Sequence, residues 1–252
     1  MSNEQRNDSP VNAGRRRLLG GAAALAGLTI APGVFLVHAS VPTRPEGTPA
    51  SDQVRWGMLV DTNRCRVDCD ACVTACREEN GWEGHDRPET DAKWIRKMTV
   101  TERDGRQTSL PMMCQHCAEP PCAYVCPTGA TFRRDDGIVL VDKHLCIGCR
   151  YCMMACPYQV RFFVHEPVAS RSPNHPRGKG TVEGCNLCVH RIDQGVLPAC
   201  VEACGERGQG ALIFGDLNDP RSRISRAIAE YGAESVRADL ELDTGVRYQG
   251  LS

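Results

Sequence analysis

Residues 146–157 read CIGCRYCMMACP, four cysteines at spacings of two, two and three residues followed by proline. The chain has 252 residues and 16 cysteines, and all of the cysteines fall between Cys65 and Cys204. They form four groups of four with no cysteine left over, so the thiols are used in sets. The groups are Cys65, Cys69, Cys72 and Cys76; Cys114, Cys117, Cys122 and Cys126; Cys146, Cys149, Cys152 and Cys156; and Cys185, Cys188, Cys200 and Cys204.

Three chemistries use cysteines at this density. An even cysteine count in an exported chain is typical of a disulfide scaffold, but disulfides impose no recurrence of these spacings. Zinc uses pairs of C-x2-C that converge on one ion, and the fourth group alone would fit such a site. A continuous C-x2-C-x2-C-x3-C run instead places three thiolates around a group larger than a single ion, as in iron–sulfur ferredoxins. The fourth cysteine of such a run binds a second cluster. The spacing therefore favours four [4Fe–4S] clusters, with zinc and disulfides as the alternatives.

The rest of the composition agrees with a small hydrophobic core that needs disulfide bonds or bound metal for stability. Aromatic residues make up only 5% of the chain, so few large apolar side chains are present to fill a core. A hydrophobic content of 41% and a charged content of 24% exclude a disordered chain. The net charge of −1 gives no support for a nucleic-acid-binding protein. Independent catalysis has no candidate residues, since the sequence holds no phosphate-binding glycine loop, nucleophile elbow or HExxH motif.

The first residues predict export from the cytoplasm. Arg15, Arg16 and Arg17 precede the uncharged run 18–37, which is rich in glycine and alanine and only weakly hydrophobic. A weak apolar run behind paired arginines is typical of a twin-arginine signal. Small residues before Ser40 predict cleavage there, whereas the length of the run also suits a retained membrane anchor. Either interpretation predicts a periplasmic globular part, and any further membrane contact there would be made through a partner.

Local signals predict short strands and short helices. An Asp-Asp-Gly turn at 135–137 predicts a β-hairpin between 131–133 and 138–141. The segments 126–132, CPTGATF, and 156–162, CPYQVRF, form an internal repeat in which a short strand follows the last cysteine of a run. Helices are expected at 71–79, 151–155 and 221–231, the last with Pro220 at its first position.

These elements predict an α+β fold of two nested ferredoxin-like modules, each built from two cysteine runs. The second and third runs would form an inner module, inserted into an outer module made by the first and fourth runs. The predicted domains are a twin-arginine signal peptide at 1–39, a linker at 40–54, the outer module at 55–109 plus 157–215, the inner module at 110–156, and a C-terminal helix and tail at 216–252.

Some polar residues near the runs can be interpreted either as purely structural or as functional. His116 lies inside the second run, where four cysteines already supply the ligands, so we expect a hydrogen-bonding neighbour rather than a ligand. The arginines could tune cluster potentials or dock a partner, although a solvated face is the plainer interpretation. They are Arg133, Arg134, Arg150 and Arg161.

The stretches 110–122, LPMMCQHCAEPPC, and 149–158, CRYCMMACPY, resemble a known family. The chain is similar over about residues 55–250 to the four-cluster iron–sulfur electron-transfer subunits of membrane oxidoreductases, such as dimethyl-sulfoxide, polysulfide, tetrathionate and formate-dependent nitrite reductases. Its leader, the C-x3-C opening of its first run and the segment 78–82, EENGW, are most similar to the periplasmic iron–sulfur subunit of the membrane complex associated with dissimilatory sulfite reductase. The resemblance implies a non-catalytic electron carrier in sulfur metabolism.

The resemblance also implies which cysteines share a cluster. The four sets are Cys65, Cys69, Cys72 and Cys204; Cys76, Cys185, Cys188 and Cys200; Cys114, Cys117, Cys122 and Cys156; and Cys126, Cys146, Cys149 and Cys152. Cys65 is the least typical ligand, because the family opens this run with C-x2-C. The implied partners are an integral membrane subunit of the polysulfide-reductase type, which exchanges electrons with quinones, and a cytochrome c subunit. The alternatives are a molybdopterin tetrathionate, polysulfide or sulfoxide reductase complex and, in another class, a disulfide-stapled exported binding module.

Overall fold

A computed structural model of the chain describes residues 44–45, 48–168 and 176–251. The predicted signal peptide lies outside the described residues. The described part combines short helices with small β-sheets, as the cysteine runs predicted, so the fold is α+β. In this part of the chain no helix is both long enough and apolar enough to cross a bilayer.

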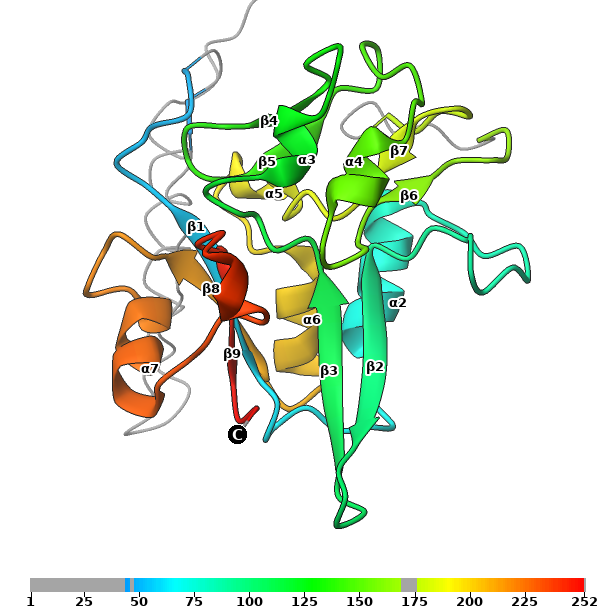
Figure 1. The fold of residues 1–252 in the computed structure, drawn as a ribbon. Helices are drawn as coiled ribbons and strands as arrows, with labels where there is room; N and C mark the ends of the chain where they lie inside the picture. The colour runs from blue at the N-terminus through cyan, green and yellow to red at the C-terminus, as the bar shows by residue number, and fades with distance from the viewer. Residues whose placement is uncertain (1–43, 46–47, 169–175, 252) are drawn as a thin grey trace, which may run out of the picture. The chain divides into compact units, whose positions relative to one another are not determined.

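The largest sheet joins segments from the two ends of the described chain (Figure 1). Its central strand β1 (Trp56–Asp61) pairs antiparallel with β8 (Leu212–Asp216) and parallel with β9 (Val246–Gln249). Side chains alternate between the two faces of a strand. Met58 accordingly packs into the main core while the next residue, Leu59, packs into a separate cluster, and both are fully buried. Strand β9 was not expected from the sequence.

Helix α7 (Arg223–Tyr231) covers the Leu59 face of this sheet. Its Ile224 packs against Leu59, and Figure 1 shows the helix beside β8. The helix was expected to begin at 221 with Pro220 in its first position, and this start is wrong. Ser222 is the N-cap instead, because its hydroxyl accepts the backbone N–H of Ser225 and so satisfies a free donor of the first turn.

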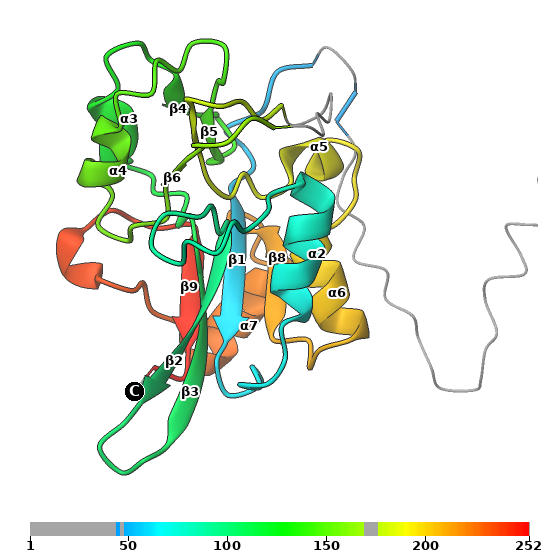
Figure 2. The same cartoon turned by 90° about the vertical axis from the view of Figure 1, so that its right-hand side faces the viewer.

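Two helices that carry cysteines pack side by side. Helix α2 (Ala71–Asn80) confirms the prediction for 71–79, and α6 (Ala199–Glu206) carries the last two cysteines of the fourth run. Their contact is the most extensive between helices among the described residues, and both views show it (Figures 1 and 2). The first and fourth cysteine runs therefore lie together although about 110 residues of sequence separate Cys76 and Cys185.

A long hairpin follows the first run. Strands β2 (Ile95–Thr101) and β3 (Gln107–Met113) pair antiparallel from Ile95 opposite Met113 to Thr101 opposite Gln107. The base of the hairpin is buried, with Ile95 and Met113 in the core, while its outer half is exposed and projects from the other elements (Figure 2). This hairpin was not predicted from the sequence.

The second and third runs carry two short helices, α3 (Pro121–Tyr124) and α4 (Tyr151–Ala155), which contact each other. Between them β4 (Thr131–Arg133) and β5 (Val139–Val141) form the predicted hairpin. The remaining elements are β6 (Phe162–Phe163), β7 (Val182–Glu183), α5 (Val189–Ile192) and a 3-10 turn at Ala238–Leu240. Cysteines from all four runs belong to one buried cluster together with the apolar side chains of these elements.

Candidate iron–sulfur centres

All sixteen cysteines lie in the described part of the chain, and each has a free thiol there. Eleven are buried, four are half-buried, and Cys149 is exposed. These thiols are available as metal ligands, in line with the cluster interpretation of the runs.

The first and fourth runs meet at two places. Cys204 is among the electrostatic neighbours of Cys65 and of Cys72, although it belongs to the far end of the fourth run. At the second place, Cys76 and Cys188 lie close enough that one amide, Asn80 Nδ2, is 3.7 Å from the first sulfur and 4.0 Å from the second. The last cysteine of each run thus has cysteines of the other run among its neighbours.

Cys185 and Cys200 complete this second place. Their main electrostatic neighbours include Cys76, and those of Cys200 also include Cys185. Four thiols from two runs are therefore neighbours, with Cys76 contributed by α2 and the others by the fourth run. Cys185 also has Cys114 as a neighbour, and Cys200 also has Cys72.

The second and third runs meet in the same way. Cys114, Cys117 and Cys122 interact with one another, and Cys156 from the third run is a neighbour of Cys114 and Cys117. These four cysteines line a small pocket with apolar walls.

Fewer contacts connect the cysteines of the last proposed set, which are Cys126, Cys146, Cys149 and Cys152. Cys146 is an electrostatic neighbour of Cys152, and Cys149 lies between them in sequence on the exposed side. The main influences on Cys126 are backbone amides and the side chain of Thr128 rather than other thiols, and they lower its pKa to about 7 although burial works in the other direction. Cys126 is thus suited to the thiolate form that metal binding requires.

Burial makes most other thiols poor acids in the absence of metal. It raises the pKa of Cys72, Cys76 and Cys117 to about 12 and that of Cys114 to about 11, and neighbouring thiols add to the effect. Thiolates crowded in a low-dielectric site are stable only if cations neutralise them. Sets of buried sulfurs therefore fit a polynuclear iron centre, since iron displaces the protons and supplies the missing positive charge.

No three or more His, Cys, Asp or Glu side chains among the described residues converge closely enough for a single metal ion.

Left-handed backbone conformations let the runs curl around these positions. Gly148 has φ +70° and Arg150 has φ +66° within the third run, while His116 in the second and Cys188 in the fourth are also left-handed. Such turns direct successive N–H groups into a concavity that favours anions. Backbone amides also donate to sulfur: Thr131 N to Cys126 at 3.4 Å, Val182 N to Cys146 at 3.4 Å, Leu187 N to Cys185 at 3.5 Å and Ala211 N to Cys204 at 3.2 Å.

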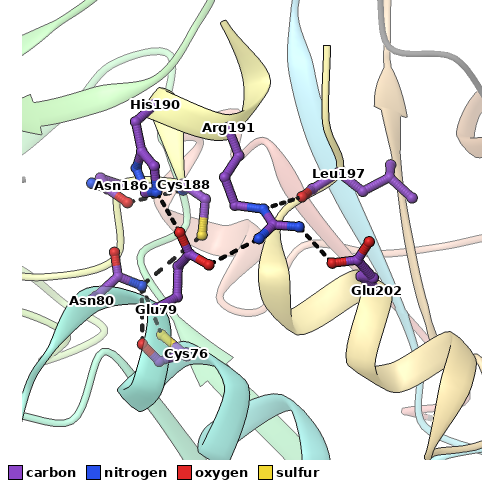
Figure 3. Close-up of polar contacts among 9 residues, drawn as sticks. All are labelled: Cys76, Glu79, Asn80, Asn186, Cys188, His190, Arg191, Leu197 and Glu202. Atoms are coloured by element: carbon purple, nitrogen blue, oxygen red, sulfur yellow. Dashed lines mark hydrogen bonds and ion pairs between the residues drawn. The ribbon is translucent and has the colours of Figure 1, made fainter. Parts of the chain in front are cut away.

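Side chains also donate to sulfur, most clearly at Cys76 (Figure 3). Trp82 Nε1 lies 3.4 Å from Cys76 Sγ, and Asn80, which is 1% exposed, reaches Cys76 and Cys188. Hydrogen bonds to ligand sulfur are a main control of cluster potential. These two residues belong to the 78–82 segment that carried part of the resemblance, and their role could not be inferred from the sequence.

A network of charged side chains holds the helices around this position (Figure 3). Glu79 of α2 accepts Arg191 Nη1 at 2.8 Å and lies 2.7 Å from His190 Nε2, and Arg191 also bonds Glu202 of α6. Burial alone would raise the pKa of Glu79, but the hydrogen bonds from His190 and Arg191 prevail and lower it. The ionised carboxylate ties α2 to α5, and Arg191 in turn ties α5 to Glu202 of α6, next to Cys76 and Cys188.

Two of the four lysines fasten loops that carry cysteines. Lys97 Nζ from strand β2 donates to the carbonyls of Arg66, Val67 and Cys69, inside the first run. Lys143 Nζ donates to the carbonyl of Val182, whose own N–H bonds Cys146. Neither lysine was predicted from the sequence. The only available signal was their rarity beside 26 arginines.

The histidine and arginines singled out in the sequence have different environments. His116 is buried and its Nδ1 accepts the N–H of Val139 at 2.9 Å, so it is a hydrogen-bonding neighbour as expected. Burial, helped by Arg161, lowers its pKa to about 3, which keeps the ring neutral. Arg150 stacks 4.8 Å from the centre of the Phe163 ring, and Arg134 pairs with Asp136 and Asp193.

Arg161 departs from the expected solvated face, because it is only 4% exposed. Arg133, by contrast, is exposed as the plainer interpretation predicted.

The chain is similar in sequence to known iron–sulfur proteins. Residues 106–216 match the 4Fe-4S dicluster domain. The chain is 38% identical over 265 residues to Hdr-like menaquinol oxidoreductase iron-sulfur subunit 1 of Archaeoglobus fulgidus, covering 94% of this chain and 97% of that protein.

Other relatives are named for different reductase systems and match less of the chain. Over 210 residues the chain is 39% identical to a tetrathionate reductase subunit of Salmonella typhimurium, covering 82% of this chain and 74% of that protein. Over 187 residues it is 40% identical to protein NrfC of Escherichia coli, covering 70% and 72% of the two chains. The resemblance to the family of iron–sulfur electron-transfer subunits is confirmed.

Proposed function

Because the chain belongs to the family of iron–sulfur electron-transfer subunits of membrane-associated reductase complexes, we propose that it passes single electrons through four [4Fe–4S] clusters between a quinone-interacting membrane subunit and redox partners. Within the family it is an electron carrier and not the catalytic subunit. The observation that carries the proposal is the grouping of free, buried thiols from different runs around shared positions.

The proposed ligands are all sixteen cysteines in crossed sets. Three cysteines of one run and the last cysteine of its partner run hold each cluster, in the sets that the resemblance implied. The approach of Cys204 to Cys65 and Cys72, and of Cys156 to Cys114 and Cys117, supports the crossing. Cys65 stays the least typical ligand, although its sulfur lies near those of Cys69 and Cys204.

We also propose that the two pairs of runs form nested ferredoxin-like modules. The packing of α2 on α6 supports an outer pair, and the contact of α3 with α4 supports an inner pair between them in sequence. The chain then places two clusters in each module, so that an electron can cross both.

The residues of the chain prepare these positions for electron transfer. Bound clusters would supply one-electron redox chemistry with little change in geometry. Trp82, Asn80 and the backbone amides around the runs hold the sulfurs and favour negative charge on them. Apolar side chains such as Met113 and Leu187 exclude water from the same core. Cys149 is the exposed cysteine, and its cluster is the natural point of entry or exit for electrons.

For the circuit, we propose a periplasmic subunit of a quinol-linked complex in dissimilatory sulfur metabolism. A relative named for menaquinol oxidation matches nearly the whole chain, which supports a membrane partner that interacts with quinones. The similarity to a tetrathionate reductase subunit supports a molybdopterin reductase complex as the second candidate. The arginines before the run 18–37 support export by the twin-arginine route, after the clusters are in place.

Iron analysis tests the cluster assignment. Anaerobically purified protein is expected to contain about sixteen irons, and as many acid-labile sulfides, for each chain. A colourless, folded protein without iron would overturn the assignment, and a content of about eight irons would limit it to one pair of clusters.

Purification of the native complex tests the circuit. From solubilised membranes the chain is expected to co-purify with an integral membrane subunit, and a menaquinol analogue should reduce its clusters. Co-purification with a molybdopterin subunit would support the second candidate. For export, Arg16→Lys combined with Arg17→Lys should retain the protein in the cytoplasm, and unchanged periplasmic recovery would contradict the twin-arginine route.

A further inference from the structure

A buried cation lies among the cysteines of the second and third runs. Arg161 directly precedes strand β6 and is 4% exposed, whereas arginine side chains are almost never fully buried without a partner. In the described part of the chain no carboxylate lies within ion-pair distance of its guanidinium, and its Nε has no hydrogen-bond partner. Its charge must therefore be balanced by something other than an acidic side chain.

The groups that face Arg161 are cysteine sulfurs. Its Nη2 lies 3.5 Å from Cys122 Sγ and 4.0 Å from Cys114 Sγ. Its main electrostatic neighbours are these two cysteines together with Cys152 and Cys156. Three of the four belong to a single proposed ligand set, so the guanidinium sits against one cluster position and further from the next.

The internal repeat supplies a comparison within the molecule. In CPTGATF and CPYQVRF the fifth residue after the first cysteine is Thr131 in one copy and Arg161 in the other. Thr131 serves the neighbouring set, since its N–H donates to Cys126 and its hydroxyl to Cys152. Equivalent positions of the repeat thus offer a neutral donor to one inner set and a buried positive charge to the other.

We propose that Arg161 sets the reduction potential of the inner cluster held by Cys114, Cys117, Cys122 and Cys156, raising it above the value that the same ligands would give with a neutral residue. A set of four thiolates is anionic, and reduction adds a further negative charge at the same place. A fixed cation in a low-dielectric site stabilises the reduced form more than the oxidised form. This inference rests on the ligand sets proposed above.

A redox titration monitored by EPR tests the proposal on the full, cluster-loaded chain. Arg161→Gln removes the charge and keeps a hydrogen-bond donor on a shorter side chain. At a fixed ambient potential it is expected to lower the reduced-to-oxidised ratio of one cluster at least tenfold, a shift of ~59 mV for one electron. The shifted signal should be the one that is lost in Cys117→Ser.

Two variants control for charge and structure. Arg161→Lys keeps the positive charge and should restore most of the potential. Arg133→Gln removes an exposed arginine from strand β4 and should leave every cluster potential unchanged. Full iron content in Arg161→Gln with unchanged potentials would overturn the role of Arg161, as would an equal shift in Arg133→Gln. Low iron in the unmodified protein would instead overturn the ligand sets.

A measurement on the unmodified protein covers the case in which Arg161→Gln does not load iron. With isotopically labelled arginine, pulsed EPR of the reduced protein is expected to detect coupling between a guanidinium nitrogen and the cluster that is lost in Cys117→Ser. Absence of that coupling in a fully loaded protein would overturn the contact and with it the proposal.

Discussion

Gly148 shows how strongly one residue can constrain a cluster run. Its φ is +70°, and a Cβ added there would lie 2.2 Å from the carbonyl oxygen of Gly180, which is backbone and cannot move aside cheaply. Gly148 stands between Cys146 and Cys149. The close contact therefore holds the third run against Gly180, in the segment that leads into β7. Only glycine satisfies both the left-handed turn and this contact.

We therefore predict that Gly148→Ala removes the cluster proposed for Cys126, Cys146, Cys149 and Cys152, with a loss of about a quarter of the iron. Gly81→Ala is the matched control: it has φ +63° but nothing within 4 Å of the added Cβ. The control should cost only about 1–2 kcal/mol of backbone strain and keep its iron. Iron content and EPR measure both, and equal iron in the two variants would contradict the steric argument.

The crossed ligand sets give a second prediction at this scale. Cys126→Ser should damage the cluster of Cys146, Cys149 and Cys152 while the cluster of its own run stays intact. Cys122→Ser should do the opposite. Low-temperature EPR distinguishes the two inner signals, and loss of the same signal in both variants would show that each run holds its own cluster.

Among the elements, strand β2 supports the first cysteine run as well as pairing with β3. Lys97 crosses from β2 to three carbonyls of the loop between Cys65 and Cys69. Hydrogen bonds from a charged donor contribute about 1.5–3 kcal/mol each, and less where water reaches them. The hairpin thereby fixes the loop whose C-x3-C spacing departs from the family.

Lys97→Met should loosen this loop, so that a chelator removes the cluster of Cys65, Cys69, Cys72 and Cys204 several-fold faster than in the unmodified protein. Lys93→Met is the control, since Lys93 Nζ makes an exposed bond to the carbonyl of Pro88 and touches no cysteine loop. Iron release followed by absorbance checks the prediction. Equal release rates in the two variants would remove the role assigned to Lys97.

Elements with local signals could be predicted from the sequence. Helix α2 and the β4–β5 hairpin follow from cysteine spacing and from an Asp-Asp-Gly turn, each contained within about ten residues. Strand β9 could not be predicted, because its four residues gain their partner from β1, almost 190 residues earlier. The start of α7 was misplaced because proline and serine are both good start signals, and the Ser225 N–H decides between them.

The same distinction applies to the site. Cysteine spacing predicted the ligands because the sequence itself holds the repeat, and the ligand sets stay a prediction. The residues around the sulfurs come from elsewhere: Lys97 from a hairpin that was not expected, and Trp82 from the turn after α2. Arg161 was expected on a solvated face because a lone arginine carries no signal of burial.

For the whole molecule, we expect the cofactors to serve as core. Cysteines of every run occupy the main buried cluster, where an apolar protein of this size would place aromatic rings. Removing iron should leave protonated thiols around empty space, which costs both the packing and the metal–ligand bonds.

We therefore predict that the iron-free chain loses cooperative thermal unfolding and protection from hydrogen exchange, at β1 as well as at the cysteine runs. Calorimetry of the loaded and iron-free forms, compared at equal pH and salt, measures the difference. A sharp unfolding transition at an unchanged temperature in the iron-free form would show that the apolar side chains suffice.

The position of β9 bears on the order in which the molecule is made. This strand spans Val246–Gln249, so the sheet that begins with β1 stays incomplete until these late residues have left the ribosome. In the proposed ligand sets Cys65 likewise awaits Cys204, about 140 residues further along the chain. Cluster insertion into the outer pair is therefore expected only after Cys204 has been synthesised, and the proposed export route would receive a folded, metal-loaded protein.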